Sequence, residues 1–365
     1  MSTTRRDTDA HAREHALCTY CPKMCRAVCP VGTAEARETT STWGKMWQAF
    51  RCAEHGEPID AEVARVFDAC TGCGACTAFC EHGVDAASAL VAMRARAYQE
   101  GWSVRADLLA ERFDRLSRCT DQDLGQLDRE EITAAPSSIA LLPGAQTLLR
   151  RPGLAGLTCR VLSDLGAGCG ALPDLARGLD VGQSLYWSGL LERFDAHAQN
   201  VAAALTRVAT VVCVDPEDAY FLGVIYPRRG VSVTPRISTV VEELGRVVDR
   251  LVLRPGPVVA YHDSCHLGRR LGAYVAPRRI IERVLGEPPL EYAWTREHAE
   301  CAGGGGLYLE SNPEGALAIA TRRWNSRPQG AQAIVTTCPT AVVLLRRAGG
   351  EALDVIELVA GERLP

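Results

Sequence analysis

Two short runs of cysteines near the N-terminus constrain this chain more than any other feature of its sequence. The first run consists of Cys18, Cys21, Cys25 and Cys29, and the second of Cys70, Cys73, Cys76 and Cys80. A metal centre with four thiolate ligands needs thiols that converge on one point, and closely spaced cysteines in one loop can supply most of them. The two runs therefore predict that the N-terminal part of the chain folds around metal centres.

The rest of the sequence favours free thiols over a disulfide framework. The chain has 365 residues and 16 cysteines, and residues 1–16 are polar and lack the apolar core of a Sec signal peptide. No run of about 18 apolar residues is present, so no helix is expected to span a membrane. We therefore expect a cytoplasmic protein, in which reducing conditions keep cysteines available to metals.

The charge balance disfavours nucleic acid as a partner. Lysine and arginine number 40 against 44 aspartates and glutamates, which gives a formal net charge of −4. Binding to a phosphate backbone requires a basic face, and this composition predicts none. Hydrophobic residues make up 47% of the chain, so we expect folded domains with a sizeable core.

The spacing within the two runs is typical of iron–sulfur centres. The second run has the C-x2-C-x2-C-x3-C pattern of ferredoxins, whereas the first has one extra residue between Cys21 and Cys25 and keeps a proline after its last cysteine. In two-cluster ferredoxins the fourth cysteine of each run ligates the other cluster. The pattern therefore predicts two [4Fe–4S] clusters, one held by Cys18, Cys21, Cys25 and Cys80 and the other by Cys70, Cys73, Cys76 and Cys29.

Structural zinc is the alternative at both runs, because C-x2-C pairs also form zinc ribbons. Zinc needs only two such pairs, and it would leave the third and fourth cysteine of each run without a role. Cys52 lies between the runs and belongs to neither. We expect a buried thiol there, with a role as substitute ligand as the alternative.

The N-terminal part is expected to be helical. Apolar residues at positions 43, 46, 47 and 50 have helical spacing, and further helices are predicted over 60–69 and 86–98. Cluster loops separated by helices look like the α-helical ferredoxin arrangement. We therefore assign residues 1–100 to an α-helical ferredoxin-like domain with two [4Fe–4S] clusters, and residues 101–135 to a helical connector.

The C-terminal part has the pattern of an α/β domain, in which short β-branched runs alternate with helical patterns. Candidate strands are 139–142, 208–214, 258–261 and 333–336. A weak internal repeat relates residues 141–145 to 261–265, 166–171 to 299–306, and 211–216 to 335–341. This part is therefore predicted to consist of two tandem repeats, residues 136–255 and residues 256–365.

The repeated motifs resemble the cysteine-rich CCG domains of heterodisulfide reductase-type iron–sulfur proteins. That family includes iron–sulfur subunits of glycolate oxidase, of anaerobic glycerol-3-phosphate dehydrogenase and of lactate-utilisation complexes. His262–Arg269 is similar to the family's first cysteine loop, while Cys301–Gly303 stands at its Cys-Cys-Gly and Cys338–Ala341 at its C-x-x-C. The resemblance implies a two-cluster ferredoxin module followed by two CCG repeats.

The first repeat departs furthest from the CCG pattern. Ala145 and Pro216 stand where the family carries cysteines, and only Cys169 and Cys213 remain. A metal cluster loses its ligands with these thiols, so we expect no cluster in the first repeat.

The second repeat keeps more of the pattern, although Ala302 and Ala341 replace two of its cysteines. A candidate third metal site consists of Cys265, Cys301 and Cys338 with His266, and His262 or an external ligand are alternatives for the fourth position. A third iron–sulfur cluster, a zinc ion with three cysteines and one histidine, and a metal-free docking surface all remain open.

These features predict an iron–sulfur electron-transfer subunit of an oxidoreductase complex. The resemblance implies a flavoprotein dehydrogenase or an electron-transfer flavoprotein as one partner, and a quinone or another carrier as the acceptor. A membrane-associated acceptor would place the protein at the inner face of the membrane through its partner. Two alternatives remain: a reductase of a heterodisulfide or quinone at the C-terminal site, and an iron–sulfur redox sensor.

Overall fold

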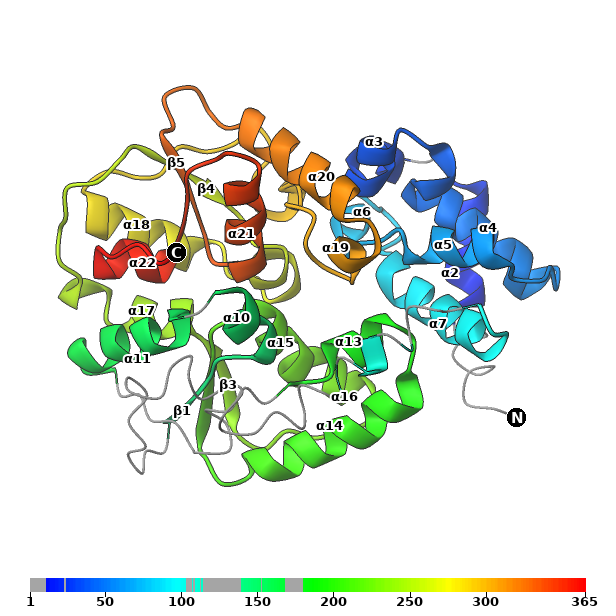
Figure 1. The fold of residues 1–365 in the computed structure, drawn as a ribbon, viewed down its shortest axis with the longest axis horizontal. Helices are drawn as coiled ribbons and strands as arrows, with labels where there is room; N and C mark the ends of the chain where they lie inside the picture. The colour runs from blue at the N-terminus through cyan, green and yellow to red at the C-terminus, as the bar shows by residue number, and fades with distance from the viewer. Residues whose placement is uncertain are drawn as a thin grey trace.

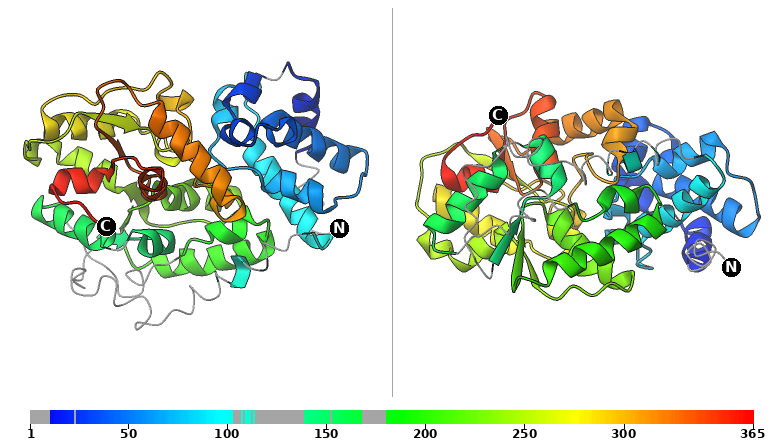
Figure 2. Two further views of the ribbon diagram at one scale, coloured as in Figure 1. Left: turned by 45° about the horizontal axis from the view of Figure 1, so that its top comes forward. Right: turned by 60° about the horizontal axis from the view of Figure 1, so that its bottom comes forward.

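The computed structural model places a helical N-terminal part beside an α/β part (Figure 1). The described residues are 11–22, 24–102, 107, 109–111, 113, 139–151, 153–167 and 180–365. Two further views show that the N-terminal helices flank one end of the α/β part, next to the helix over residues 313–325 (Figure 2). The predicted connector over residues 101–135 lies mostly outside the described residues, and so does Cys169.

The N-terminal part is helical, as the sequence predicts. Its helices are α2 (Ala12–Tyr20), α3 (Pro30–Glu35), α4 (Thr42–Glu54), α5 (Ala61–Asp68), α6 (Ala75–Ala78) and α7 (Ala86–Gln99). Side-chain caps help to fix where α4 and α5 begin, because Ser41 and Asp60 each accept a hydrogen bond from a backbone N–H of the first turn. Met46, Phe67 and Leu90 form the centre of a core between α4, α5 and α7.

Two three-stranded parallel sheets form the centre of the α/β part, with strand orders β1-β2-β3 and β4-β5-β6. Their bounds are β1 Ile139–Leu142, β2 Thr210–Cys213, β3 Arg236–Thr239, β4 Val259–His262, β5 Ala333–Thr336 and β6 Ala352–Asp354. The sequence predicts β1, β2, β4 and β5. It misses β3, whose first residue is exposed and charged, and β6, which has only three residues.

Helices surround both sheets (Figure 1). They are α10 (Ala145–Arg150), α11 (Leu154–Asp164), α13 (Gln183–Trp187), α14 (Leu191–Leu205), α15 (Pro216–Tyr220), α16 (Tyr226–Arg228), α17 (Val240–Arg246), α18 (Val275–Leu285), α19 (Tyr308–Ser311), α20 (Pro313–Asn325), α21 (Pro339–Arg347) and α22 (Val355–Ala360). One hydrophobic core joins the sheets, since it includes Val212 of β2 and Val335 of β5. A buried ion pair of 2.8 Å between Arg151 and Glu357 also links the two halves.

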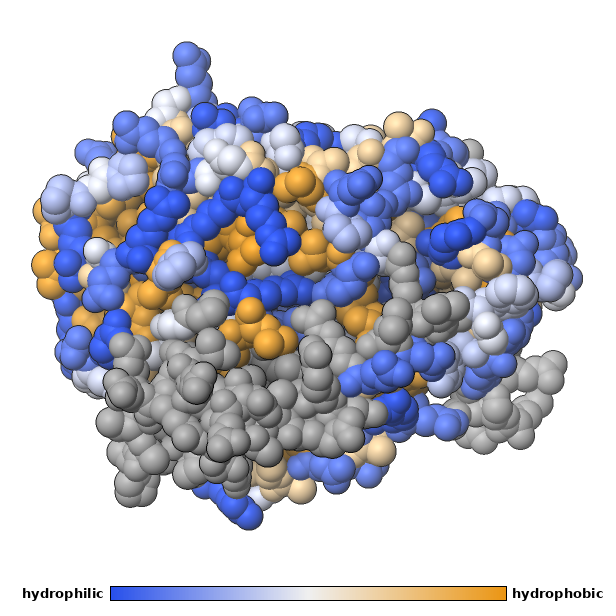
Figure 3. Space-filling view, in the orientation of Figure 1, coloured by the Kyte–Doolittle hydropathy of each residue, from blue (hydrophilic) through white to orange (hydrophobic). Residues whose placement is uncertain are grey.

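Among the residues that Figure 3 colours by hydropathy, hydrophilic ones predominate on this face and hydrophobic ones form separate groups. Within the part of the chain that the structure describes, no helix is both long and apolar enough to cross a membrane.

Candidate metal centres

The structure brings the first three cysteines of the first run close to the last cysteine of the second. Burial raises the pKa of the Cys18 thiol to about 12, and the nearby Cys25 and Cys80 thiols add to this. The pKa of Cys25 rises to about 11 through burial and through its neighbours Cys21 and Cys80. Cys80 follows α6 in the chain, so the end of the second run folds back onto the first.

The second group of thiols joins Cys29 to the remaining cysteines of the second run. Partial burial raises the pKa of the Cys76 thiol, and the neighbouring thiols of Cys73, Cys70 and Cys29 raise it further. Cys25, from the first group, also raises the pKa of Cys76, so the two groups of cysteines adjoin each other. The cysteines of the two runs therefore lie near one another, and their division into two crossed ligand sets stays a prediction.

The chemistry of these thiols fits an iron–sulfur cluster. Burial and mutual repulsion hold the thiols of Cys18, Cys25 and Cys76 in their protonated form. Iron cations would supply the positive charge that stabilises the thiolates. A four-iron cluster keeps its four cysteines farther apart than a single metal ion would, because each cysteine binds a different iron. Among the described side chains, no three His, Cys, Asp or Glu groups lie close enough to hold a single metal ion.

Backbone N–H groups donate hydrogen bonds to two of the N-terminal cysteines, and Cys52 lies in the helical core. The Gly72 N–H donates to Cys70 Sγ at 3.4 Å and the Gly32 N–H to Cys29 Sγ at 3.5 Å. Such hydrogen bonds to sulfur tune cluster potentials. Cys52 is buried at 1% exposure in the helical core, and burial raises its pKa to about 11. It is thus the buried thiol that the sequence predicts.

The candidate third site is a pocket whose lining includes Cys265, Cys301 and Cys338. Cys265 follows β4, Cys338 caps α21 after β5, and Cys301 lies in the loop before α19. A hydrogen bond with Cys265, together with burial, raises the pKa of the Cys301 thiol to about 12. Ala302 and Ala341 line the same pocket where the family carries cysteines.

The two histidines of this pocket differ in what they can bind. Arg323 Nε donates to His262 Nδ1 at 3.0 Å, and both side chains are buried. Because a guanidinium can only donate, neutral His262 carries its proton on Nε2 and has no free lone pair for a metal. His266 lies with Nδ1 3.8 Å from Cys265 Sγ. The geometry thus favours His266 over His262 as the histidine of this site.

Two acidic residues of the first α/β half also line the third pocket, and sequence reasoning misses both. Burial and the neighbouring Glu217 raise the pKa of Asp215 to about 6. The Glu217 carboxylate accepts a hydrogen bond from Trp187 Nε1 at 2.8 Å and lies 3.8 Å from His266 Nε2. The repeat alignment carries the signal that would have found them, because Asp215 and Pro216 align with the stretch around Cys338.

The second group of N-terminal cysteines lies directly against the third pocket. Cys73 and Cys301 pack in one cluster, and a hydrogen bond to Cys301 is the main cause of the raised pKa of Cys73. Arg269 Nε donates to the Cys73 carbonyl at 2.8 Å, and Arg270 donates to the Gly72 carbonyl at 3.2 Å. Both arginines lie within five residues of Cys265 in the chain, so their hydrogen bonds hold the third pocket against the N-terminal cysteine loop.

Glycine makes the close approach of the two loops possible. A Cβ at Gly306 would lie 2.5 Å from the Cys70 carbonyl oxygen, and this residue has a φ of +59°. Only glycine fits such a contact in this conformation. The Gly-rich stretch over 303–306 therefore serves to pack the C-terminal loop onto the cysteine loop of the N-terminal part.

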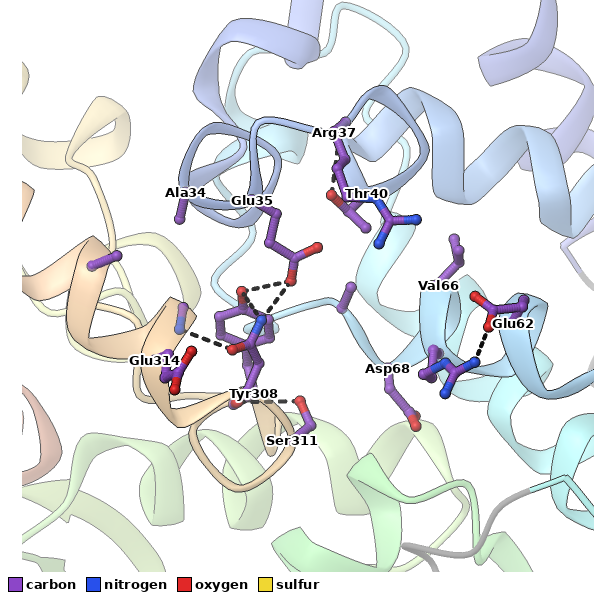
Figure 4. Close-up of a pocket in the computed structure, with 15 residues that line it drawn as sticks. Ala34, Glu35, Arg37, Thr40, Glu62, Val66, Asp68, Tyr308, Ser311 and Glu314 are labelled. Carbon is purple, nitrogen blue, oxygen red and sulfur yellow. Dashed lines mark hydrogen bonds and ion pairs between the residues drawn. The ribbon is translucent and has the colours of Figure 1, made fainter.

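A groove of about 510 Å³ opens beside Cys29, between the N-terminal part and the segment from α19 to α20 (Figure 4). Tyr308 OH and Asn312 Nδ2 both donate to the Glu35 carboxylate, at 2.7 Å and 2.9 Å. Tyr308 is buried in the same apolar cluster as Cys29 and Ala69. Tyr308 and Ala69 both line the groove, so two of its lining residues belong to the apolar cluster that contains Cys29.

Comparison with known families identifies the two parts of this arrangement. Residues 14–84 match the 4Fe-4S dicluster domain, and residues 259–345 match the cysteine-rich domain CCG. The chain is therefore an iron–sulfur protein that combines a dicluster domain with a CCG domain, and iron–sulfur clusters are its cofactors.

The curated relatives include oxidoreductases and oxidoreductase subunits. The chain is 26% identical, over 86% of its length, to a fumarate reductase (CoM/CoB) subunit of Methanothermobacter marburgensis, and it spans 64% of that protein. It is 24% identical to a dihydromethanophenazine:CoB–CoM heterodisulfide reductase subunit of Methanosarcina mazei, over 80% of this chain and 76% of the relative. A shorter stretch, 38% of the chain, is 29% identical to 21% of the EtfAB:quinone oxidoreductase of Syntrophomonas wolfei.

Proposed function

We propose that this chain relays electrons between a flavoprotein and a downstream acceptor through two [4Fe–4S] clusters. Cys18, Cys21, Cys25 and Cys80 would hold the first cluster, and Cys70, Cys73, Cys76 and Cys29 the second. The proposal rests on the closeness of the two groups of thiols, since Cys25 lies near enough to Cys76 to raise its pKa. Electron transfer between adjoining clusters needs no substrate at either of them.

The direction of the path follows from the position of the second group. Cys73 contacts Cys301 of the third pocket, whereas the strongest neighbours of Cys18 are cysteines of the N-terminal part. In this proposal the first cluster exchanges electrons with a flavoprotein, and the second passes them to the C-terminal part. The relative with EtfAB in its name supports an electron-transfer flavoprotein as donor. A quinone is the acceptor class that the same name favours, with the protein held at the membrane through its partner.

A stopped-flow experiment tests the relay. Anaerobically purified chain is mixed with an electron-transfer flavoprotein that has been reduced beforehand, and cluster bleaching is followed in the visible range. Reduction of both clusters by the flavoprotein, at a rate that rises with its concentration, is the expected result. If dithionite reduces the clusters but the reduced flavoprotein leaves them oxidised, the flavoprotein link is wrong.

The third pocket supports a second candidate function, the reduction of a substrate there. Its cysteines lie beside His266 and the carboxyl groups of Asp215 and Glu217. The two-repeat organisation, residues 136–255 and 256–365, belongs to the same proposal, because each half contributes one side of the pocket. Cys265, Cys301, Cys338 and His266 would be the ligands if this pocket holds a metal or cluster.

A single variant separates the two functions. Cys265→Ser should leave the N-terminal clusters and their reduction by the flavoprotein intact. If turnover of a heterodisulfide or quinone disappears in this variant, the third pocket is a catalytic site. If turnover persists in the variant, the third pocket is not its site, and if the wild type shows no turnover, the chain acts as a relay alone.

A further inference from the structure

Lys45 is a buried cation in the middle of the N-terminal part. It lies on α4, its exposure is 2%, and it is one of only two lysines in the chain. A buried ammonium group is costly unless an anion compensates its charge. Among the described residues, no ion pair with a carboxylate includes Lys45. Its hydrogen-bond partner is Cys29, whose Sγ lies 3.4 Å from Nζ.

The surroundings of Lys45 point to the second group of cysteines. The thiols that interact electrostatically with the Lys45 ammonium group are Cys29, Cys70 and Cys76, three of the four ligands proposed for the second cluster. The strongest charged neighbours of Cys18 and Cys25 are instead other cysteines. The buried charge of Lys45 therefore lies against the second group of cysteines.

We propose that Lys45 is the built-in counter-ion of the second cluster and raises its reduction potential above that of the first. The inference rests on the ligand sets of the proposed function. A cluster gains one negative charge on reduction, so a nearby buried cation favours the reduced form. The Nζ–H···Sγ hydrogen bond to Cys29 draws electron density from the sulfur and acts in the same direction.

The consequence is a downhill path toward the C-terminal part. One electron leaves the first cluster, which is oxidised, and reduces the second, with no proton taken up or released. The second cluster adjoins the third pocket through Cys73 and Cys301. Lys45 is therefore a tuning residue, which acts through the cluster and touches no substrate.

The test is an anaerobic redox titration followed by EPR on the full chain, with iron content measured in parallel. Lys45→Met removes the charge and the hydrogen bond, Lys45→Gln keeps a donor without charge, and Lys45→Arg keeps the charge. Arg51→Gln is the control, because it removes a half-buried cation that pairs with Glu57 from the same helix. A Cys29→Ser variant identifies which of the two signals belongs to the second cluster.

Both neutral variants should shift the potential of the second cluster to lower values and leave the first unchanged, while Lys45→Arg and Arg51→Gln stay near the wild type. If the neutral variants instead lose half of the iron and Lys45→Arg retains it, the charge is needed to hold the cluster, which also supports the proposal. Unchanged potentials at full iron content in Lys45→Met overturn it, and so does equal iron loss in all three Lys45 variants. A wild type without two reversible couples would refute the relay itself.

Discussion

The thiols of Cys73 and Cys301 are in contact, although 228 positions separate them in the numbering, and this contact joins the dicluster domain to the CCG domain. Cys73 belongs to the second group of N-terminal cysteines, and Cys301 to the third pocket. Arg269 and Gly306 hold the two loops at this distance, one by hydrogen bonds and one by its lack of a side chain. In the proposed relay, an electron on the second cluster would therefore lie at the edge of the C-terminal site.

Crossed ligation makes a specific prediction for pairs of cysteine variants. Cys18 and Cys80 are proposed to hold the same cluster, so Cys18→Ser combined with Cys80→Ser should lose no more iron than either single variant. About four irons per chain should remain, since each cubane cluster holds four. Cys70→Ser combined with Cys80→Ser should lose both clusters. If Cys18→Ser with Cys80→Ser loses both clusters, while Cys70→Ser with Cys80→Ser keeps one of them, each run ligates its own cluster.

The clamp formed by Arg269 should contribute measurably to stability. Its guanidinium donates to the Cys73, Glu297 and Ala299 carbonyls, and Arg269→Ala removes all of these bonds. Each hydrogen bond from a charged donor to a buried acceptor contributes about 1.5–3 kcal/mol. We expect a loss of a few kcal/mol in the free energy of unfolding, measured by urea denaturation of the anaerobic protein.

Arg283→Ala is the control for this variant, since Arg283 makes an exposed hydrogen bond of 3.4 Å to the Asp249 carbonyl. It should change the free energy of unfolding by less than about 0.5 kcal/mol. Equal effects of the two variants would show that the clamp does not hold the domains together.

Gly306 allows a matched test of the loop contact. Gly306→Ala places a Cβ against the Cys70 carbonyl, whereas Gly349→Ala has the same left-handed backbone problem with no neighbouring atom within 4 Å. The conformational cost of about 1–2 kcal/mol is therefore common to both. The extra loss of stability and of iron in Gly306→Ala, measured by thermal unfolding and iron analysis, reports the contact alone. Similar values for both variants would contradict it.

Asp354 predicts a pH dependence of stability. This buried residue caps α22, and burial raises its pKa to about 7 in the folded protein. The unfolded chain releases the same proton near its ordinary value of about 4. The contribution of this group is therefore fully present below about pH 4 and is lost as the pH rises to about 7.

Asp354→Asn keeps a side-chain acceptor for the cap and removes this titration. The free energy of unfolding of the variant, relative to the wild type, should increase by up to a few kcal/mol between pH 4.5 and pH 8, an upper range set by about 1.4 kcal/mol per pKa unit. Urea denaturation at several pH values measures this difference. A difference that does not change with pH would show that Asp354 is ionised throughout.

The cysteine spacing predicts the 4Fe–4S dicluster domain, which the family comparison confirms, whereas the division of the cysteines into two ligand sets stays a prediction. The helices α4, α5 and α7 and four strands also follow from periodicity. Lys45, Arg269 and Glu217 were not predictable as parts of the site, because their roles depend on contacts between segments far apart in the chain. β3 and β6 were missed because an edge strand with a charged start and a three-residue strand carry little local signal.

The relay through two clusters is tested most directly by the iron, acid-labile sulfide and zinc content of the anaerobically purified chain. The account predicts about eight irons and eight sulfides per chain from two cubane clusters, and no zinc at the N-terminal cysteines. About twelve of each would add a cluster in the third pocket and favour catalysis there. Two zinc ions without iron or sulfide would contradict the account.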